Sequence, residues 1–272
     1  MRYGTKQRWG VAACLVLALG LLILAGMVGA QDGSPSFRDP RVFPPASFPF
    51  GKGYSEWGAE WWQWNLSIPL SENPLFDETG EKCMVGQRGP VWFLVGVLNV
   101  SGIAIRHCSV PEGIALFFPV LNIITVNPLP PDAPIPLATL RDNNRSAIDL
   151  VANLLVEVDE IPIRSLELFR FTSPVFSVTP PENNINLAQG NVTEGAPGTH
   201  FPAVDEGFYV MLKPLPIGEH TLRIHGEVPS FAFVLDITYH LTVVPLTRPY
   251  GVFFHEVLVH AAELLRSSRD KP

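Results

Sequence analysis

The chain has 272 residues, of which 47% are hydrophobic and 17% charged, and its net charge is −7 at pH 7. The apolar fraction is sufficient for a substantial core. The acidic balance makes nucleic acid and anionic lipid poor candidates for a partner, so we expect no nucleic-acid binding.

Residues 1–30 have the three parts of a secretory signal peptide. A basic N-terminal region with three Lys or Arg residues precedes an apolar run at 11–30. Val28-Gly29-Ala30 places small residues at positions −3 and −1 of a cleavage site. We expect cleavage after Ala30 and a secreted or periplasmic protein that has no membrane association afterwards. Loss of those three basic residues leaves 16 basic and 26 acidic residues, a net charge of −10. Because about 20 apolar residues can also span a bilayer, an uncleaved anchor is the alternative.

Two cysteines remain after cleavage, Cys83 and Cys108. In an oxidising compartment we expect them to form a disulfide, which would stabilise the fold by about 3 kcal/mol. The alternative is two free buried thiols, because the sequence does not ensure that their Cα atoms come within bridging distance.

Residues 31–53 are rich in proline, serine, glycine and phenylalanine without a hydrophobic period, which predicts an extended N-terminal arm. A helix is predicted next, from an N-cap at Ser55 to the residue before Pro69. Four of the six tryptophans of the chain lie within residues 57–64 of this helix.

The tryptophans of the predicted helix occupy two faces. At about 100° per residue, Trp57, Trp61 and Trp64 fall on one stripe, whereas Trp62 points away from it. Tryptophans at helical spacing are more often core than surface, so we expect the stripe to be buried and Trp62 to be the exposed contact. The alternative is an exposed stripe that stacks on a glycan or anchors a partner protein.

The chain becomes β in character from Pro90 onward. Short apolar runs bounded by glycine and proline predict buried strands, and aperiodic or proline-rich stretches predict loops. A loop as long as 180–203 is typical of functional or disordered segments. The predicted strands are 91–95, 114–120, 154–158, 169–171 and 175–178, with a helix at 146–153, a turn at 159–160 and loops at 127–136 and 180–203.

The clearest pattern lies near the C-terminus. Strict alternation of residue types over 231–243 predicts a long strand with one buried face, and 219–225 alternates in the same way. The two strands follow a turn at 214–218 and form a hairpin of the kind that closes a β-sandwich. After Pro249, residues 253–266 have the pattern of an amphipathic helix.

These elements predict a mainly β protein. We expect a β-sandwich of jelly-roll or Ig-like type, with one or two packed helices and a C-terminal helical tail. The sandwich domain with its Trp-rich helix would cover residues 54–248, and the tail residues 249–272.

Several segments resemble those of a group of exported bacterial proteins of unknown function. That group shares a Trp-rich helix of the type WxxxWWQW, two cysteines and a C-terminal β-hairpin, and the resemblance covers about residues 50–245. Because no activity is established for the group, the resemblance implies no catalytic residue. It rests on Trp57-Gly58-Ala59-Glu60-Trp61-Trp62-Gln63-Trp64, Gly89-Pro90-Val91-Trp92-Phe93-Leu94, Cys108-Ser109-Val110-Pro111, Phe117-Phe118-Pro119 and Leu215-Pro216-Ile217-Gly218-Glu219-His220-Thr221-Leu222.

One candidate polar site lies on the face of the predicted hairpin opposite its apolar stripe. Side chains from the two strands come within cross-strand range there and could form a metal site or an acid/base pair. The alternative is the solvated outside of a sandwich, which routinely carries such polar residues. The set, called the outer-face set below, comprises Arg223, His225, Asp236, Thr238 and His240.

A second candidate is the pair Glu56 and Glu60, four residues apart on the aromatic helix. Like charges at this spacing repel by a few tenths of a kcal/mol unless a cation or ligand offsets them, and the aromatic setting resembles a sugar site. The alternative is two exposed glutamates, since one helix face supplies no partner across a scissile bond.

The sequence favours non-catalytic binding in the periplasm or outside the cell, with a polysaccharide or an envelope protein as the ligand. The competing class is a hydrolase or lyase that acts on an envelope or extracellular polymer, through Glu56, Glu60 or the outer-face set. A structural envelope component is the third class. We expect no cofactor and no bound metal, because the sequence has no phosphate loop, nucleophile elbow or cysteine pairs at zinc spacing.

Overall fold

The structure is a computed structural model that describes residues 39–98, 102–128, 134–188, 190 and 195–246. The expected signal peptide at 1–30 and the expected tail at 249–272 lie outside these residues. In the described part of the chain, no helix combines the length and the apolar character needed to cross a membrane.

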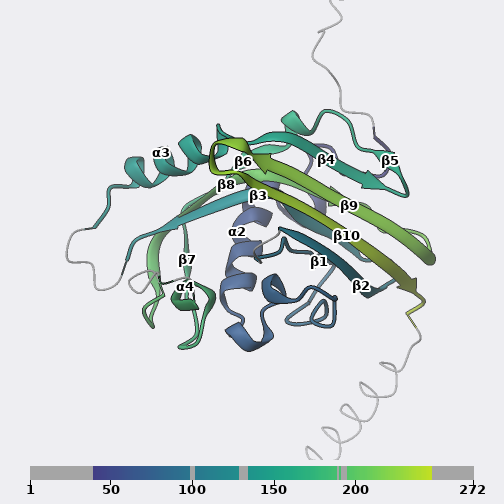
Figure 1. The fold of residues 1–272 in the computed structure, drawn as a ribbon, viewed down its shortest axis with the longest axis horizontal. Helices are drawn as coiled ribbons and strands as arrows, with labels where there is room; N and C mark the ends of the chain where they lie inside the picture. The colour runs from purple at the N-terminus through teal and green to yellow at the C-terminus, as the bar shows by residue number, and fades with distance from the viewer. Residues whose placement is uncertain (1–38, 99–101, 129–133, 189, 191–194, 247–272) are drawn as a thin grey trace, which may run out of the picture. The chain divides into compact units, whose positions relative to one another are not determined.

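The protein is mainly β, as predicted, and its strands form two mixed five-stranded sheets (Figure 1). The first sheet has the order β1-β3-β8-β6, and β7 also pairs with β8. Its strands are β1 (Val91–Phe93), β3 (Ala115–Val126), β6 (Arg170–Thr172), β7 (Phe176–Val178) and β8 (His200–Leu212). The second sheet has the order β2-β10-β9-β4-β5. Its strands are β2 (Ile103–Pro111), β4 (Ala152–Val158), β5 (Ile161–Pro162), β9 (Gly218–Val228) and β10 (Phe233–Val244).

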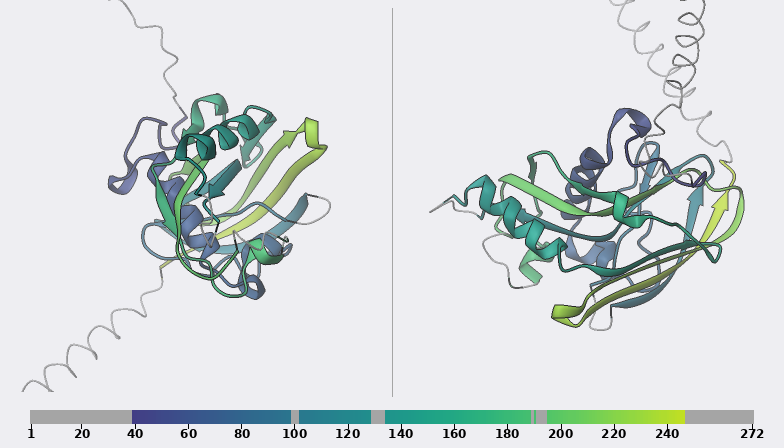
Figure 2. Two further views of the ribbon diagram at one scale, coloured as in Figure 1. Left: turned by 90° about the vertical axis from the view of Figure 1, so that its left-hand side faces the viewer. Right: turned by 90° about the horizontal axis from the view of Figure 1, so that it is seen from above.

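The two sheets pack face to face, with helices against the first sheet (Figure 2). A Cβ atom on Gly226 of β9 would lie only 2.9 Å from the side chain of Leu121 on β3, so the sheets approach closely there. Helix α2 packs on β3, β6, β7 and β8, and α3 packs on β3 and β8. The helices are α2 (Tyr54–Leu66), α3 (Leu137–Ile148) and α4 (Ile185–Ala188), and the 3-10 turns are η1 (Pro49–Gly51), η2 (Leu70–Glu72), η3 (Pro74–Phe76), η4 (Leu166–Phe169) and η5 (Pro229–Phe231).

The predicted C-terminal hairpin is present as β9 and β10, which pair in antiparallel register. The inward residues of β10 are buried from Leu235 to Val243. The predicted stripe extends too far toward the N-terminus, because Phe231 lies in η5 with 71% of its surface exposed and Phe233 is 36% exposed. Ala232 adopts a left-handed conformation at φ 50° and ends the alternation at the hairpin tip.

Besides the two-residue β5, two long strands, β8 and β2, escaped the sequence prediction, for different physical reasons. Residues 203–212 of β8 are buried on both faces, so the strand has no apolar and polar alternation. Strand β2 alternates, but Arg106 occupies a buried position while Ile103 and Ile105 are 56% and 58% exposed. Its pattern therefore places one charged side chain, Arg106, inward and two isoleucines outward.

The expected helix at 146–153 is correct only for its first three residues. The helix is α3, which begins after Pro136 and ends at Ile148, and the remaining residues form a turn and the start of β4. Its buried residues Leu140, Asn144 and Ile148 recur every four positions, but the one in the middle is polar, which weakens the apolar signal. The expected loop at 180–203 is also wrong in part, since it contains α4 and the first residues of β8.

The predicted disulfide between Cys83 and Cys108 is present, with Cα atoms 5.9 Å apart. It fixes the segment before β1 along the edge of β2, where His107 N donates to Thr79 O at 2.8 Å. Arg106, 1% exposed, donates to the carbonyl oxygen of Asp77 at 2.7 Å in the same segment. The disulfide and these hydrogen bonds cover an edge that would otherwise offer unpaired backbone groups.

Candidate functional site

The predicted tryptophan stripe of α2 is buried. Trp57, Trp61 and Trp64 are 5%, 1% and 5% exposed. Each indole Nε1 donates to a main-chain carbonyl oxygen: Trp57 to Pro49 at 3.1 Å, Trp61 to Leu94 at 2.8 Å and Trp64 to Val85 at 3.1 Å. Satisfied indoles on a buried face belong to the core, so these three rings offer no stacking platform.

Trp62 has a different environment, on the other face of the helix. It is half-buried, and its Nε1 donates to Asp205 Oδ1 on β8 at 2.9 Å. The Tyr209 hydroxyl donates to the same carboxylate oxygen at 2.5 Å, and Asn122 Nδ2 on β3 donates to the Tyr209 oxygen at 3.0 Å. Four side chains from α2, β3 and β8 therefore form one polar chain that converges on a buried carboxylate.

Burial raises the pKa of Asp205 to about 7, since a carboxylate that is 1% exposed loses most of its hydration. The hydrogen bonds from Tyr209 and Trp62 act in the opposite direction, and the charge of Glu206 raises the pKa further. Burial also raises the pKa of the Tyr209 hydroxyl well above its usual range. Tyr209 is therefore a neutral hydrogen-bond donor at physiological pH.

Two glycines make room for this polar chain. A Cβ atom on Gly58 of α2 would lie 2.8 Å from Asp205 Oδ2 and 3.3 Å from the Tyr209 ring. A Cβ atom on Gly207 of β8 would lie 2.5 Å from Asn122 Cβ. Larger residues at either position would displace the side chains that surround the carboxylate.

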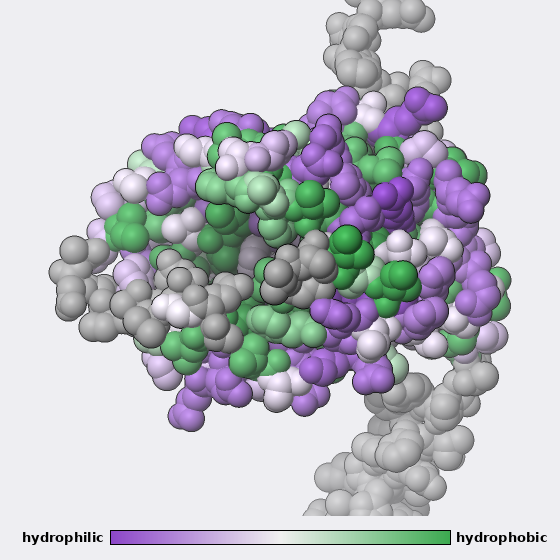
Figure 3. Space-filling model, in the orientation of Figure 1, coloured by the Kyte–Doolittle hydropathy of each residue, from purple (hydrophilic) through white to green (hydrophobic). Residues whose placement is uncertain are grey.

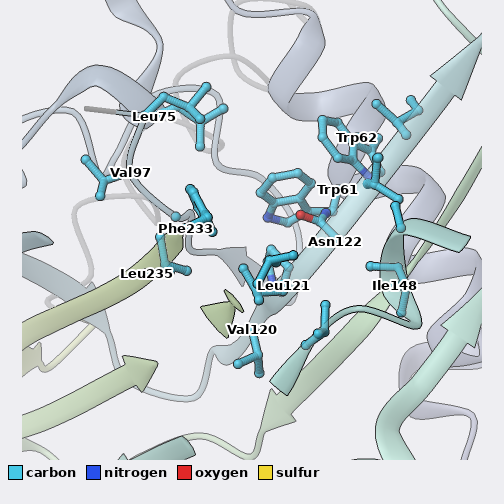
Figure 4. A pocket seen from close by; sticks show the side chains of 18 of the residues that line it. Trp61, Trp62, Leu75, Val97, Val120, Leu121, Asn122, Ile148, Phe233 and Leu235 are labelled. Carbon is cyan, nitrogen blue, oxygen red and sulfur yellow. The ribbon is translucent and has the colours of Figure 1, made fainter. Parts of the chain in front are cut away.

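A cavity of about 480 Å³ adjoins the polar chain between the two sheets. It is lined almost entirely by apolar side chains, and Figure 3 shows hydrophobic residues around the hollow at the surface. Trp61 and Trp62 form one wall, β3 another, and Leu235 of the second sheet faces them (Figure 4). The volume lies within the range of small-molecule sites.

A β-bulge in β3 shapes this wall. Pro119 pairs with Tyr209 and Leu121 pairs with Phe208, so Val120 is an extra residue without its own partner on β8. Bulges bend a strand and redirect its side chains. All residues from Pro119 to Ile124 line the cavity, including Asn122.

The tip of the β9–β10 hairpin borders the cavity opposite α2. Phe231 and Phe233 both line it while remaining 71% and 36% exposed, so apolar rings lie between the cavity and solvent. Exposed apolar surface beside a cavity is typical of interaction and ligand-binding sites.

The outer-face set lies away from the cavity and forms an ion cluster. Arg223 donates to both oxygens of Asp236 at 3.0 and 2.8 Å, and the His225 Nδ1 atom lies 3.4 Å from Asp236 Oδ2. His240 stacks on His107 at 4.8 Å between ring centroids, and Thr238 is half-buried on the same face. The hydrogen bond with Arg223 lowers the pKa of Asp236. Among the described residues, no group of three or more His, Cys, Asp or Glu side chains could hold a metal ion.

Glu56 and Glu60 are not brought together on a common target. Glu56 accepts a hydrogen bond from the backbone of Gly53 at 2.8 Å and so caps the helix N-terminus. Glu60 forms an ion pair with Lys52. Their contacts are those of a helix surface, and both residues lie outside the cavity wall.

Asn122, Asp205 and Tyr209 were not among the site residues predicted from the sequence. The available signal was the acidic pair Asp205-Glu206 inside an otherwise apolar run at 203–212. A carboxylate within a strand that is buried on both faces needs hydrogen-bond donors, which marks the position as unusual.

Comparison with known proteins places this chain in no recognised group. No known sequence family matches it, and no curated protein sequence is similar to it. Among solved structures, the cysteine protease inhibitor EhICP2 from Entamoeba histolytica aligns with 57% of this chain and 96% of its own length, at 13% identity. The TM-score is 0.21, too low to support an argument about fold or function.

Proposed function

We propose that this protein is an exported, non-catalytic binding protein that holds a small apolar molecule in the cavity between its sheets. The observation that carries the proposal is the cavity of about 480 Å³ with an apolar wall. Water finds few hydrogen-bond partners in such a space. An apolar ligand is stabilised there because its surface is buried against Trp61, Leu121 and Leu235.

The ligand class differs from the polysaccharide or envelope protein that the sequence led us to expect. A glycan would need stacking rings together with several hydrogen-bonding groups, but three of the four helix tryptophans are core residues. The half-buried Trp62 turns its polar edge toward Asp205, so it offers the cavity mainly apolar surface.

A hydrolase or lyase is the second candidate, and one observation favours it. Asp205 has a pKa near 7 beside a cavity, which suits a general acid or base. Its Oδ1 atom, however, already accepts hydrogen bonds from Trp62 and Tyr209, and those residues with Asn122 separate it from the cavity. We therefore infer that Asp205 orients neighbouring groups and does not react with a ligand.

The proposal of export rests on the predicted signal peptide at residues 1–30. The disulfide is compatible with export, because disulfides persist in oxidising compartments. Protein recovered from the native host should begin at Gln31. An intact N-terminus in the membrane fraction would instead support an anchor.

Titration with the neutral apolar dye N-phenyl-1-naphthylamine tests binding. We expect saturable dye fluorescence with one site per chain. The variant Ile124→Phe fills part of the cavity and should weaken binding about tenfold or more, since a filled pocket excludes ligand atoms. The matched control Ile161→Phe changes a residue that is 59% exposed on β5 and should bind as the wild type does. Equal binding by both variants would refute the cavity as the site.

A further inference from the structure

Building on the proposed apolar-ligand function, we propose that the ligand carries a hydroxyl group and that Asn122 Oδ1 accepts its hydrogen bond. The ligand would thus be an apolar alcohol, either long-chain or polycyclic. Asn122 would be the residue that distinguishes it from hydrocarbons, ethers and carboxylates.

The orientation of the Asn122 amide follows from the polar chain behind it. The Tyr209 hydroxyl has one hydrogen, and it donates that hydrogen to Asp205 Oδ1 at 2.5 Å. Its oxygen can then only accept, so the amide group 3.0 Å away must present Nδ2 to it. The second donor to the carboxylate, Trp62, holds Asp205 in place. The chain of donors therefore fixes Asn122 Oδ1 on the opposite side, away from Tyr209.

That side is the cavity. Asn122 lines the wall, and Figure 4 shows its oxygen pointing into the cavity beside Trp61. Within the described residues, no hydrogen bond reaches this oxygen from the protein, although its Nδ2 is bonded. A half-buried acceptor in apolar surroundings is unfavourable unless a ligand group or a water molecule donates to it.

The two indole nitrogens of the wall are already engaged, and its other polar residue, Asn186, is not without a partner. The indole nitrogens of Trp61 and Trp62 donate to Leu94 O and Asp205. Asn122 is thus the side chain through which the described wall can recognise a polar group. An acceptor oxygen selects a donor, and a hydroxyl on an otherwise apolar molecule is the simplest group that fits.

The same geometry disfavours an ionised carboxylate as the ligand group. Its oxygens would face the Asn122 oxygen, which cannot donate, and at pH 8, above the pKa of Asp205, they would also approach the buried charge of that residue. A fatty acid above its pKa should therefore bind less well than the alcohol of the same length.

Displacement of N-phenyl-1-naphthylamine at pH 8 by three matched compounds tests this proposal. 1-Decanol has the donor, methyl decyl ether keeps the oxygen but lacks the donor, and decanoate is charged. For the wild type we expect 1-decanol to bind about five- to tenfold more tightly than the ether, and decanoate to bind more weakly than either. Equal affinity for alcohol and ether would overturn the proposal while leaving apolar binding intact. If none of the three compounds nor the dye binds, the proposed function itself fails.

Two variants separate recognition by Asn122 from other causes. Asn122→Leu removes the acceptor, so the alcohol should lose its advantage while the affinity for the ether stays within about twofold. Tyr209→Phe keeps the ring that stacks on Phe117 with centroids 5.3 Å apart, but it frees the amide to rotate, and the preference should fall severalfold. The control Ile161→Leu changes a residue of β5 outside the cavity wall and should keep the full preference.

If Asn122→Leu fails to fold, the preference of Tyr209→Phe for the alcohol over the ether still tests the role of Asn122. Retention of the full alcohol preference in either variant would show that another group, or a bound water alone, accepts the hydrogen bond from the ligand hydroxyl. That result would overturn the role assigned to Asn122.

Discussion

Gly58 on α2 faces Asp205 on β8 so closely that a methyl group on the glycine would lie 2.8 Å from the carboxylate oxygen Oδ2. The contact explains why a residue with poor helix propensity occupies the middle of the Trp-rich helix. The absence of a side chain lets the helix backbone pack against the carboxylate and the Tyr209 ring.

We predict that Gly58→Ala destabilises the fold by about 1–3 kcal/mol, although alanine is the better helix former, because the added methyl group overpacks the site. Urea unfolding provides the measurement. The control is Gly96→Ala, where an added Cβ would meet its nearest neighbour at an ordinary 3.5 Å, and it should change stability little. A stabilised Gly58→Ala variant would contradict the close contact.

Truncation of the buried tryptophans should damage stability. We expect Trp57→Ala, Trp61→Ala and Trp64→Ala each to cost about 3–5 kcal/mol, the usual range for a buried large aromatic residue. Trp62→Ala should cost less, because Trp62 is half-buried. Thermal or denaturant unfolding of the four variants measures the loss of stability. Variants of the three stripe positions that are as stable as the wild type would show that the stripe is not part of the core.

The raised pKa of Asp205 predicts a pH dependence of stability. The pKa of this carboxyl is about 7 in the folded state, against an ordinary value of 3.8, so between these two pH values the folded state holds a proton that the unfolded state releases. Stability should therefore fall as pH rises from about 4 to 7, by about 3–4 kcal/mol in total from this group. The difference in unfolding free energy between wild type and Asp205→Asn isolates the effect. A difference that does not vary between pH 4 and 8 would refute it.

Reduction of the disulfide should lower stability. The bridge joins residues 25 apart in sequence, and opening such a loop costs about 3 kcal/mol by the chain-entropy estimate. For a domain of this size the melting temperature should drop by roughly 6–12 °C. Calorimetry with and without reductant measures the drop, and Cys83→Ala/Cys108→Ala should melt near the reduced protein. Free-thiol titration of denatured, unreduced protein should detect none.

The sequence by itself determined the features that depend on local periodicity. The alternation of β10 from Leu235 onward marks its buried face, and the spacing of Trp57, Trp61 and Trp64 marks the buried face of α2. Side-chain direction in a single helix or strand follows from backbone geometry alone, so these assignments need no partner. The even number of cysteines after the predicted signal peptide likewise predicted the disulfide.

Only the tertiary structure decided the candidate site. Asn122 and Tyr209 lie 87 residues apart, and they meet because β3 and β8 pair in one register with an extra residue at Val120. The central strand β8 is buried on both faces, so its sequence carries no period that would reveal which face Asp205 occupies. A cavity is the space left between elements that pack over long range, and strand register and helix placement set its walls. These depend on the summed packing of the whole core, which no local pattern in the chain encodes.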